Sequence, residues 1–551
     1  MATRVDLAAR VQGPGPALDD GRLPIRVRIG VTGHRRLADP GRVREEVRRR
    51  LGQIAAHFPA SDVTDVVFSV LSALAEGADR IVAEETIAFF GAERAELVAV
   101  LPLDPDDYAS DFETPESKAA FHEALDGASH VIQTRWQGGR DEAYWQAGRA
   151  VVERCDVLIA VWDGLKAQGH GGTAEVVDYA VRREVPVLTV PVGDDETSAD
   201  EAPAPPAPHW PPPAWRHLDE YNSLDRRLAR RRHAIEAEGG RPDEDIDEPG
   251  VRALFERIAA WSVPCYARAE VRARDYQRRY YVVVDLLFGL AALAVAAVAW
   301  QTSFRPEQPL WTLGETAALT LAVAGFWYGR RRHLHDAWIG YRSLAEAFRS
   351  GQFLALVGAG QDDDGRIDPS RPPARTQQWF RRAFTEAWRR RPAGATETDP
   401  VPALRDVLVG QWIDPQIRYH RKTADRAERR HHGVTVSVEA LLGVAIVLSL
   451  FHAFGVAEEH RFLSELLVFL AIALPGLSAA LTGHREQRQY RLHAERSRRT
   501  AQQLEHVRDE LLRAGELATL RRLAAEAQAM MVAENLDWYG VVELQELEVA
   551  F

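Results

Sequence analysis

Three short segments in the first third of the chain combine glycine with polar or charged side chains. They are Gly33, His34 and Arg35; Ser72, Glu76, Gly77 and Asp79; and Gly171, Gly172, Thr173 and Glu175, with Asp163 a few residues before the last group. Glycine lets a backbone approach a ligand closely, arginine supplies positive charge, and the first amides of a helix hold a phosphate. These residue types predict a binding site for a ligand that carries a phosphate. Each segment alone could also be an ordinary turn or helix cap.

Apolar stretches that alternate with helical patterns must position these segments. The expected strands are 25–31, 65–70, 96–101, 155–161 and 185–190, and a helix is expected to open at Asp39 and Pro40. The alternation predicts an α/β Rossmann-like fold with a doubly wound parallel sheet. Ligands of such sheets lie beyond the carboxyl ends of the strands. The three segments follow strands, so we expect them to meet there.

Residues 25–193 resemble the SLOG superfamily, which includes the LOG phosphoribohydrolases and the Rossmann domain of DNA-processing protein A. The likeness lies in the Gly30–Arg35 turn, the Ser72–Asp79 segment, the strand ending at Asp163, and Gly171 to Glu175. It implies a nucleotide ligand. In LOG enzymes a glutamate follows the threonine by three positions, whereas Glu175 follows Thr173 by two, which turns its side chain about 100° around a helix. This departure favours binding without N-glycosidic cleavage.

Four apolar runs occupy the second half of the chain, at about 282–300, 312–329, 434–454 and 464–482. Their lengths approach the roughly 20 residues that a helix needs to cross a bilayer. A shift of 154 residues places Val284 on Val438 and Asp285 on Glu439. We therefore predict an all-α membrane domain with four transmembrane helices in two repeats. The alternative is a pair of buried hairpins in a soluble protein.

Arginines flank these runs on one side only. The short loops inside the two hairpins carry only Arg305 and Arg461, whereas the outer flanks are strongly basic. Positive residues stay in the cytoplasm. This predicts a multi-pass protein of the bacterial inner membrane with cytoplasmic N- and C-termini.

Acidic residues recur at similar depths in the two repeats: Asp285 and Glu439 near the cytoplasmic ends, Glu315 and Glu465 near the outer ends. They could be interfacial carboxylates paired with Arg279 or Arg430. They could also line an oligomeric pore, where rings of carboxylates favour cations. The long charged stretch 485–535 is either a solvated bundle helix or the contact that joins copies into a homo-oligomer.

The hairpin half resembles the SLATT family of two-transmembrane effector modules from bacterial conflict systems, in two tandem copies over about 215–551. That resemblance implies a ligand-gated membrane effector, with the lipid bilayer as partner and a signalling nucleotide, such as a cyclic oligonucleotide or an ADP-ribose derivative, as ligand. The alternative is a membrane-tethered nucleotide or nucleoside hydrolase with Glu175 as catalytic acid or base. An anchor needs one span, so four spans with repeated acids favour the sensor.

Composition disfavours several other classes of protein. The 551 residues carry a net charge of −12, which disfavours sequence-independent nucleic-acid binding, and only two cysteines, which disfavours a disulfide framework or a cysteine metal site. No cofactor or metal site is expected. The expected division is a disordered N-terminus (1–24), a nucleotide-binding domain (25–193), a Pro-rich linker (194–215), a first membrane repeat (216–357), a polar linker (358–400) and a second membrane repeat (401–551).

Overall fold

The computed structural model describes residues 20–58, 61–134, 138–165, 171–192, 213–239, 246–308, 310–359, 378–456 and 459–543. The chain forms two compact units. We call Met1–Leu224 with Asp368–Arg391 the sheet unit, and Asp225–Ile367 with Pro392–Phe551 the helical unit. Most of the expected N-terminal disorder and of the Pro-rich linker lies outside the described residues. Leu23, within the expected disordered segment, is described and buried.

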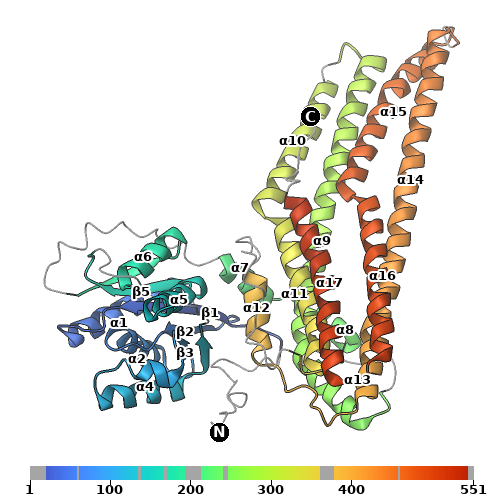
Figure 1. The fold of residues 1–551 in the computed structure, drawn as a ribbon. Helices are drawn as coiled ribbons and strands as arrows, with labels where there is room; N and C mark the ends of the chain where they lie inside the picture. The colour runs from blue at the N-terminus through green and yellow to red at the C-terminus, as the bar shows by residue number, and fades with distance from the viewer. Residues whose placement is uncertain are drawn as a thin grey trace. The chain divides into compact units, whose positions relative to one another are not determined.

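Six parallel strands form the centre of the sheet unit (Figure 1). They are β1 (Ile25–Gly33), β2 (Val66–Ser72), β3 (Ala95–Leu101), β4 (His130–Gln133), β5 (Val157–Trp162) and β6 (Val187–Pro191). Their order is β4-β3-β2-β1-β5-β6, with Ile25 opposite Val66 and Ile29 opposite Val157. The predicted parallel sheet is confirmed. Strand β4 was not predicted, because its four residues contain only two large apolar side chains.

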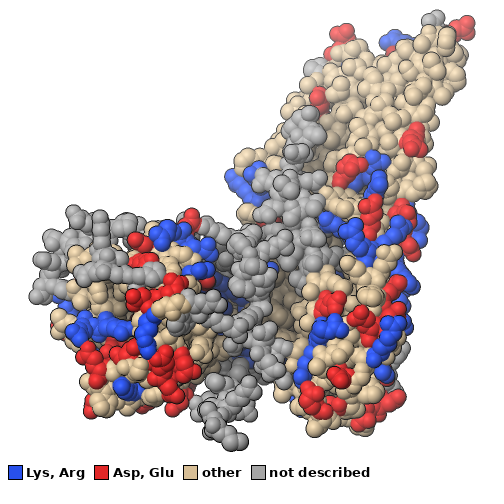
Figure 2. All heavy atoms as spheres, in the orientation of Figure 1, with Lys and Arg blue, Asp and Glu red and all other residues tan. Residues whose placement is uncertain are grey.

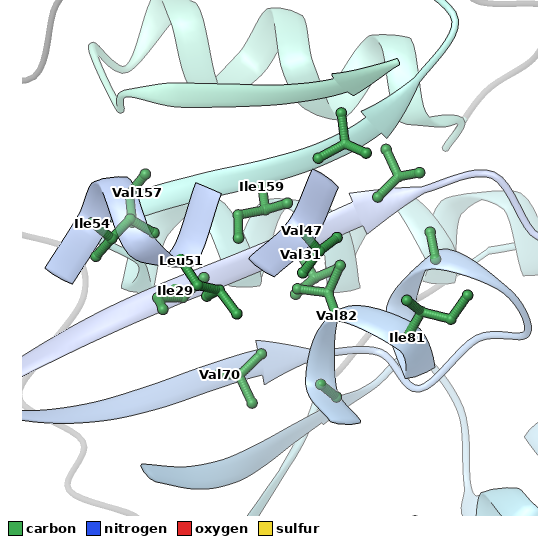
Figure 3. Close-up of a cluster of buried hydrophobic side chains, with 14 of the residues drawn as sticks. Ile29, Val31, Val47, Leu51, Ile54, Val70, Ile81, Val82, Val157 and Ile159 are labelled. Carbon is green, nitrogen blue, oxygen red and sulfur yellow. The ribbon is translucent and has the colours of Figure 1, made fainter. Parts of the chain in front are cut away.

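Helices cover both faces of this sheet. They are α1 (Pro40–Ala56), α2 (Ala78–Phe90), α3 (Pro105–Ala109), α4 (Pro115–Gly127), α5 (Arg140–Arg154) and α6 (Thr173–Arg182). On one face, Val47 and Leu51 of α1 and Val82 of α2 pack against Ile29 and Ile159 (Figure 3). On the other face, α5 and α6 pack against the alternate residues of β5. Asp39 caps α1 by accepting a hydrogen bond from the Arg42 amide at 3.0 Å, as expected.

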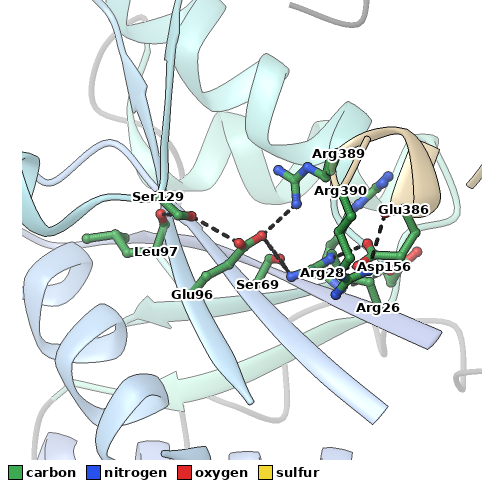
Figure 4. A network of polar contacts seen from close by, with 10 residues as sticks. All are labelled: Arg26, Arg28, Ser69, Glu96, Leu97, Ser129, Asp156, Glu386, Arg389 and Arg390. Carbon is green, nitrogen blue, oxygen red and sulfur yellow. Dashed lines mark hydrogen bonds and ion pairs between the residues drawn. The ribbon is translucent and has the colours of Figure 1, made fainter. Parts of the chain in front are cut away.

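Two helices distant in sequence complete the sheet unit. In α7 (Pro213–Asn222), the Asn222 side chain bonds to the backbone of Leu23 in both directions. The second, α12 (Gln378–Trp388), lies within the stretch that we expected to be a polar linker. Its Glu386 joins Arg26 of β1 and Arg390 in a buried network of ion pairs (Figure 4). The chain therefore leaves the sheet unit, builds part of the helical unit, and returns.

The helical unit contains α8 (Arg226–Gly239), α9 (Pro249–Phe304), α10 (Leu310–Arg331), α11 (Leu334–Leu356), α13 (Val401–Val407), the π-helix η4 (Leu408–Ile413), α14 (Asp414–Ala453), α15 (Arg461–Arg488), α16 (Tyr490–Arg513) and α17 (Leu517–Glu543). Helix α9 packs against α10, α11 and α15, while α14 packs against α15 and α16. Two short breaks are alike. His333 separates α10 from α11 at φ 45°, and Gln489 separates α15 from α16 at φ 46°.

Three helical stretches are long and apolar enough to cross a membrane: Pro249–Phe304, Val401–Ala453 and Arg461–Arg513. Their apolar parts expose large side chains such as Leu293 (58% exposed) and Ile446 (62%). Figure 2 shows a long stretch of the helical unit almost free of charged residues, with a few charged side chains at its tip and many toward the other end. Helix α10, expected as a fourth span, is 22 residues long but is not among these three stretches. Its hydropathy is lowered by Glu315, Thr316 and Thr320.

Candidate ligand cleft at the carboxyl ends of the strands

A cleft of about 490 Å³ opens where the strand order changes direction, between β1 and β5. We call it the β1/β5 cleft. Such switch points are the usual ligand sites of open parallel sheets, because the neighbouring connections leave toward opposite faces. Eight of the twelve predicted ligand residues line it: Gly33, His34, Arg35, Asp79, Asp163, Gly171, Gly172 and Thr173.

The turn that follows β1 makes close contacts with the neighbouring backbone. A Cβ on Gly33 would lie 2.4 Å from the Cβ of Ala78, and one on Gly77 would lie 2.3 Å from the Arg35 carbonyl oxygen. Gly77 also has φ +80°, which L side chains rarely adopt. The His34 amide donates to the Val161 carbonyl at 3.1 Å, and the Ala78 amide donates to the His34 carbonyl at 3.1 Å. Glycine at both positions therefore lets the turn after β1 lie between β5 and α2.

Polar side chains stand on this turn. His34 Nε2 lies 3.3 Å from Asp163 Oδ1 across the strand ends. The Arg35 guanidinium lies 5.1 Å from the centre of the Tyr144 ring of α5, so the ring orients it. Gly172 is the N-cap of α6 and makes no side-chain cap bond. A cation and a helix N-terminus in one cleft form an arrangement that favours an anion.

Asp79 is an acid of the cleft whose pKa is shifted by its surroundings. Its carboxylate accepts hydrogen bonds from the Ala73 amide at 3.0 Å and from Ser72 Oγ at 3.3 Å. Burial raises the pKa of Asp79 to about 6, although these hydrogen bonds act in the opposite direction. Ser72 itself is fully buried. Ser72 and Asp79 therefore hold the loop 73–77 in place.

Four predicted residues do not line the cleft: Ser72, Glu76, Gly77 and Glu175. Glu76 accepts a hydrogen bond from Ser117 of α4. Glu175 accepts a hydrogen bond from the Gly171 amide at 2.8 Å, so its carboxylate fixes the glycine turn at the start of α6. Gly171 has φ +81° and would clash with the Asp141 carbonyl if it carried a Cβ.

Aromatic residues that the sequence did not single out also line the cleft: Tyr108, Tyr144 and Trp162. Tyr108 is buried, and burial raises its pKa strongly. Tyr144 donates a hydrogen bond to Asp111. Their rings offer flat apolar surface beside the charged turn. No signal in the sequence distinguishes them from core aromatics, because α3 and α5 are placed by the tertiary fold.

The four acids of the apolar helices have different surroundings. Asp285 accepts from Arg488 Nη2 at 2.6 Å and faces His484 Nε2 at 3.0 Å, both on α15. Arg279, one of the two arginines suggested as partners for these acids, instead lies one turn from Asp275 and binds it at 2.7 Å. Glu465 pairs with Arg461 at 2.8 Å and Glu315 is half-buried. Glu439 is exposed and has no ion-pair partner within the described residues.

Residues 410–538 match a family model, that of SMODS and SLOG-associating 2TM effector domain 1. The matched segment runs from η4 into α17 and covers most of the stretch Val401–Ala453 and all of Arg461–Arg513. The predicted resemblance to a SLATT module is thus confirmed for this part of the chain. It implies a membrane effector of a conflict or defence system. No curated protein matches the chain.

The described part of the chain shows no candidate metal site. Among those residues, no group of three or more His, Cys, Asp or Glu side chains could hold a metal ion. Cys155 and Cys265 are both buried.

Proposed function

We propose that the chain is a nucleotide-sensing membrane effector: the β1/β5 cleft binds a signalling nucleotide, such as a cyclic oligonucleotide or an ADP-ribose derivative, and the helical unit responds by opening a pore or disrupting the membrane. The observation that carries the proposal is the combination, in one chain, of a glycine-lined cleft that holds Arg35 and a helix N-terminus with a segment similar to a two-transmembrane effector domain. Phosphates would lie against Gly33, Gly172 and Thr173, with Arg35 supplying charge.

The same proposal includes four spans in two tandem hairpins. The breaks at His333 and Gln489 support it, because each interrupts the chain just after the second helix of a hairpin with the same left-handed conformation. Helix α10 would then cross beside α9, against which it packs. Both termini would be cytoplasmic, and α16 and α17 would join copies into a homo-oligomer.

The return of the chain to the sheet unit supports coupling. Helix α12 lies between the two proposed hairpins in sequence and is held at the amino ends of the strands by Arg26, while the β1/β5 cleft lies at their carboxyl ends. A ligand that shifts β1 would thus act on the segment connecting the hairpins. Moving a population from 1:99 to 99:1 requires a preference of about 5.5 kcal/mol, which several sites in an oligomer would supply more readily than one.

The geometry of the cleft does not support the alternative of a membrane-tethered hydrolase. Its expected acid or base, Glu175, is engaged by the Gly171 amide and does not line the cleft.

Leakage from liposomes tests the proposal. Vesicles that contain the full chain and an entrapped dye should leak only when the cognate member of a nucleotide panel is added. Asp285→Asn combined with Glu439→Gln should change the ion preference of the leak and leave nucleotide binding intact. Steady turnover of a nucleotide without leakage would instead support the hydrolase.

A further inference from the structure

A second cavity lies within the helical unit, in the parts of α9, α11, α14 and α16 that adjoin the apolar stretches. Its volume is about 760 Å³, within the roughly 300–1,000 Å³ of typical small-molecule sites. We call it the arginine cavity. Seven arginines line it: Arg274, Arg342, Arg349, Arg426, Arg430, Arg488 and Arg496. Of the described carboxylates, two line it, Glu270 and Glu346.

These two carboxylates are already occupied by three of the arginines. Arg342 Nη1 lies 3.1 Å from Glu270 Oε2, and Arg342 also pairs with Glu346. Arg274 binds Glu270 at 2.8 Å. Arg349 lies 3.3 Å from Glu346. A fourth arginine, Arg488, is bound to Asp285 outside the cavity. Four of the seven arginines are therefore paired, but with only three carboxylates between them.

Arg426, Arg430 and Arg496 remain without an ion-pair partner among the described residues. Arg426 donates only to neutral oxygens, the Lys422 carbonyl and Thr423 Oγ1. The Nη1 atom of Arg496 is buried and has no hydrogen-bond partner in the described structure. A buried donor left unsatisfied carries a desolvation cost, and like charges around one cavity add repulsion. Both costs fall if an anion enters.

A buried histidine also lines the cavity. His420 of α14 is 6% exposed. Burial is the main cause that lowers its pKa to about 4; Glu346 acts in the opposite direction, and Arg342 and Arg349 contribute to the lowering. Aromatic rings complete the wall: Tyr281, Trp338, Tyr419 and Tyr490. The Arg488 guanidinium lies 3.7 Å from the centre of the Tyr281 ring.

We propose that the arginine cavity binds a phosphate-bearing anion with two or more negative charges. Arg496 and Arg430 would donate charge-assisted hydrogen bonds to its oxygens, and the tyrosines would contact the rest of the molecule. This site is separate from the β1/β5 cleft and does not depend on what that cleft binds. The same chemistry could be presented by a soluble phosphorylated compound or by an anionic lipid headgroup.

Binding of inorganic pyrophosphate to the full chain tests the proposal in nanodiscs of phosphatidylcholine alone. Arg496→Gln together with Arg430→Gln should weaken binding by roughly tenfold or more, because two charge-assisted contacts are lost. Arg499→Gln is the matched control, an exposed arginine of the same helix that does not line the cavity. Arg35→Ala, in the β1/β5 cleft, should leave this component of binding unchanged.

A second arm separates the two sources of phosphate. The chain is reconstituted with phosphatidylglycerol, and the lipid retained after detergent washing is measured by native mass spectrometry. Pyrophosphate binding without lipid retention identifies a soluble ligand, and retention that the double variant loses identifies a headgroup. Either result supports the site. Failure of both, or binding that the double variant and Arg499→Gln alter equally, would overturn it.

The melting temperature of the ligand-free protein shows whether these arginines are structural. Removing uncompensated cations should leave this temperature unchanged or raise it. Arg496→Lys, which retains the charge but not the planar fork, should bind with intermediate affinity. A marked drop in melting temperature without ligand would mean that Arg496 supports the fold, and would contradict the proposal.

Discussion

Arg26, the second residue of β1, donates two hydrogen bonds to the carboxylate of Glu386, which lies 360 residues further along the chain: Nε to Oε2 at 2.6 Å and Nη2 to Oε1 at 2.7 Å. Both side chains are 5% exposed. Glu96 of β3 also contacts Arg26 at 2.8 Å, and Arg389, the residue after α12, contacts Glu96 at 2.7 Å. The amino ends of the central strands thus bind α12 through charge.

Glu386→Gln should release α12 from the sheet. Removing one partner of a buried ion pair costs about 3–5 kcal/mol, and the remaining contact of Arg26 with Glu96 favours the lower end of this range. Hydrogen exchange of the full chain should show faster exchange in peptides from α12 and β1. Glu113→Gln is the control, since Glu113 and its partner Arg36 are 69% and 88% exposed. Unchanged protection of α12 would show that other contacts hold it.

Acid should weaken the same contact. The Arg26 guanidinium lowers the pKa of Glu386 to about 2 against the opposing effect of burial. A carboxylate with a lowered pKa contributes stability that is present above its unfolded value of about 4.5 and is lost as the pH falls toward 2. Protection of α12 should therefore decrease below pH 4.5 in the wild type, whereas Glu386→Gln should show little further change.

Asp79→Asn should raise the stability of the sheet unit at neutral pH. The pKa of Asp79 is raised to about 6 from 3.8, so the buried carboxyl stabilises the fold below pH 4 and that contribution is lost as the pH rises through 6. The difference corresponds to about 3 kcal/mol at pH 7. Melting curves between pH 4 and 8 should show this slope in the wild type and in the exposed control Asp106→Asn, but not in Asp79→Asn. A slope that persists would mean that another group titrates.

Arg35→Ala should weaken nucleotide binding in the β1/β5 cleft by roughly ten- to a hundredfold, the value of one charge-assisted contact. Arg36→Ala is a matched control, because Arg36 is the next residue, is 88% exposed and does not line the cleft. Calorimetry with a panel of signalling nucleotides measures both. Equal affinities of the two variants would remove Arg35 from the site.

Labelling of single cysteines should determine how many helices cross the membrane. With four spans, residues 305 and 460 lie outside and residue 397 lies inside. If α10 does not cross, residues 305 and 397 lie on the same side. The two native cysteines are buried and should react slowly with an impermeant maleimide, so a wild-type control reports the background.

The parts of the fold that follow from local pattern were predictable. Helix α1 has apolar residues at helical spacing, and all four are buried on its inner face as expected: Val43, Val47, Leu51 and Ile54. The glycine turns near the strand ends were also predictable, since Gly33 follows an apolar run and Gly171 precedes a helical pattern. Eight of twelve ligand residues meet because parallel strands end on one edge of a sheet.

Features that depend on distant pairing were not predictable. Nothing local in 378–388 shows that Glu386 meets Arg26, because a charged amphipathic helix has the same pattern on a sheet as in solvent. Glu175 was expected at the ligand, but its carboxylate binds the amide of Gly171, four residues earlier. Arg279 of the same helix was one of two arginines suggested for the acids of the spans, whereas the partners of Asp285 lie on α15. In each case charge predicts that a partner exists but does not identify it.

The return of the chain through α12 has a consequence for biosynthesis. A ribosome releases every strand of the sheet, and then α9 and α10, before it reaches Glu386. Until that point one of the two acidic partners described for Arg26 is missing, and Glu96 alone is present. A fragment ending at residue 224 would lack the Glu386 contact of Arg26 at its strand ends. The sheet unit is therefore completed only after α9, α10 and α11 have been made, so its maturation follows the synthesis of the first membrane-length helix.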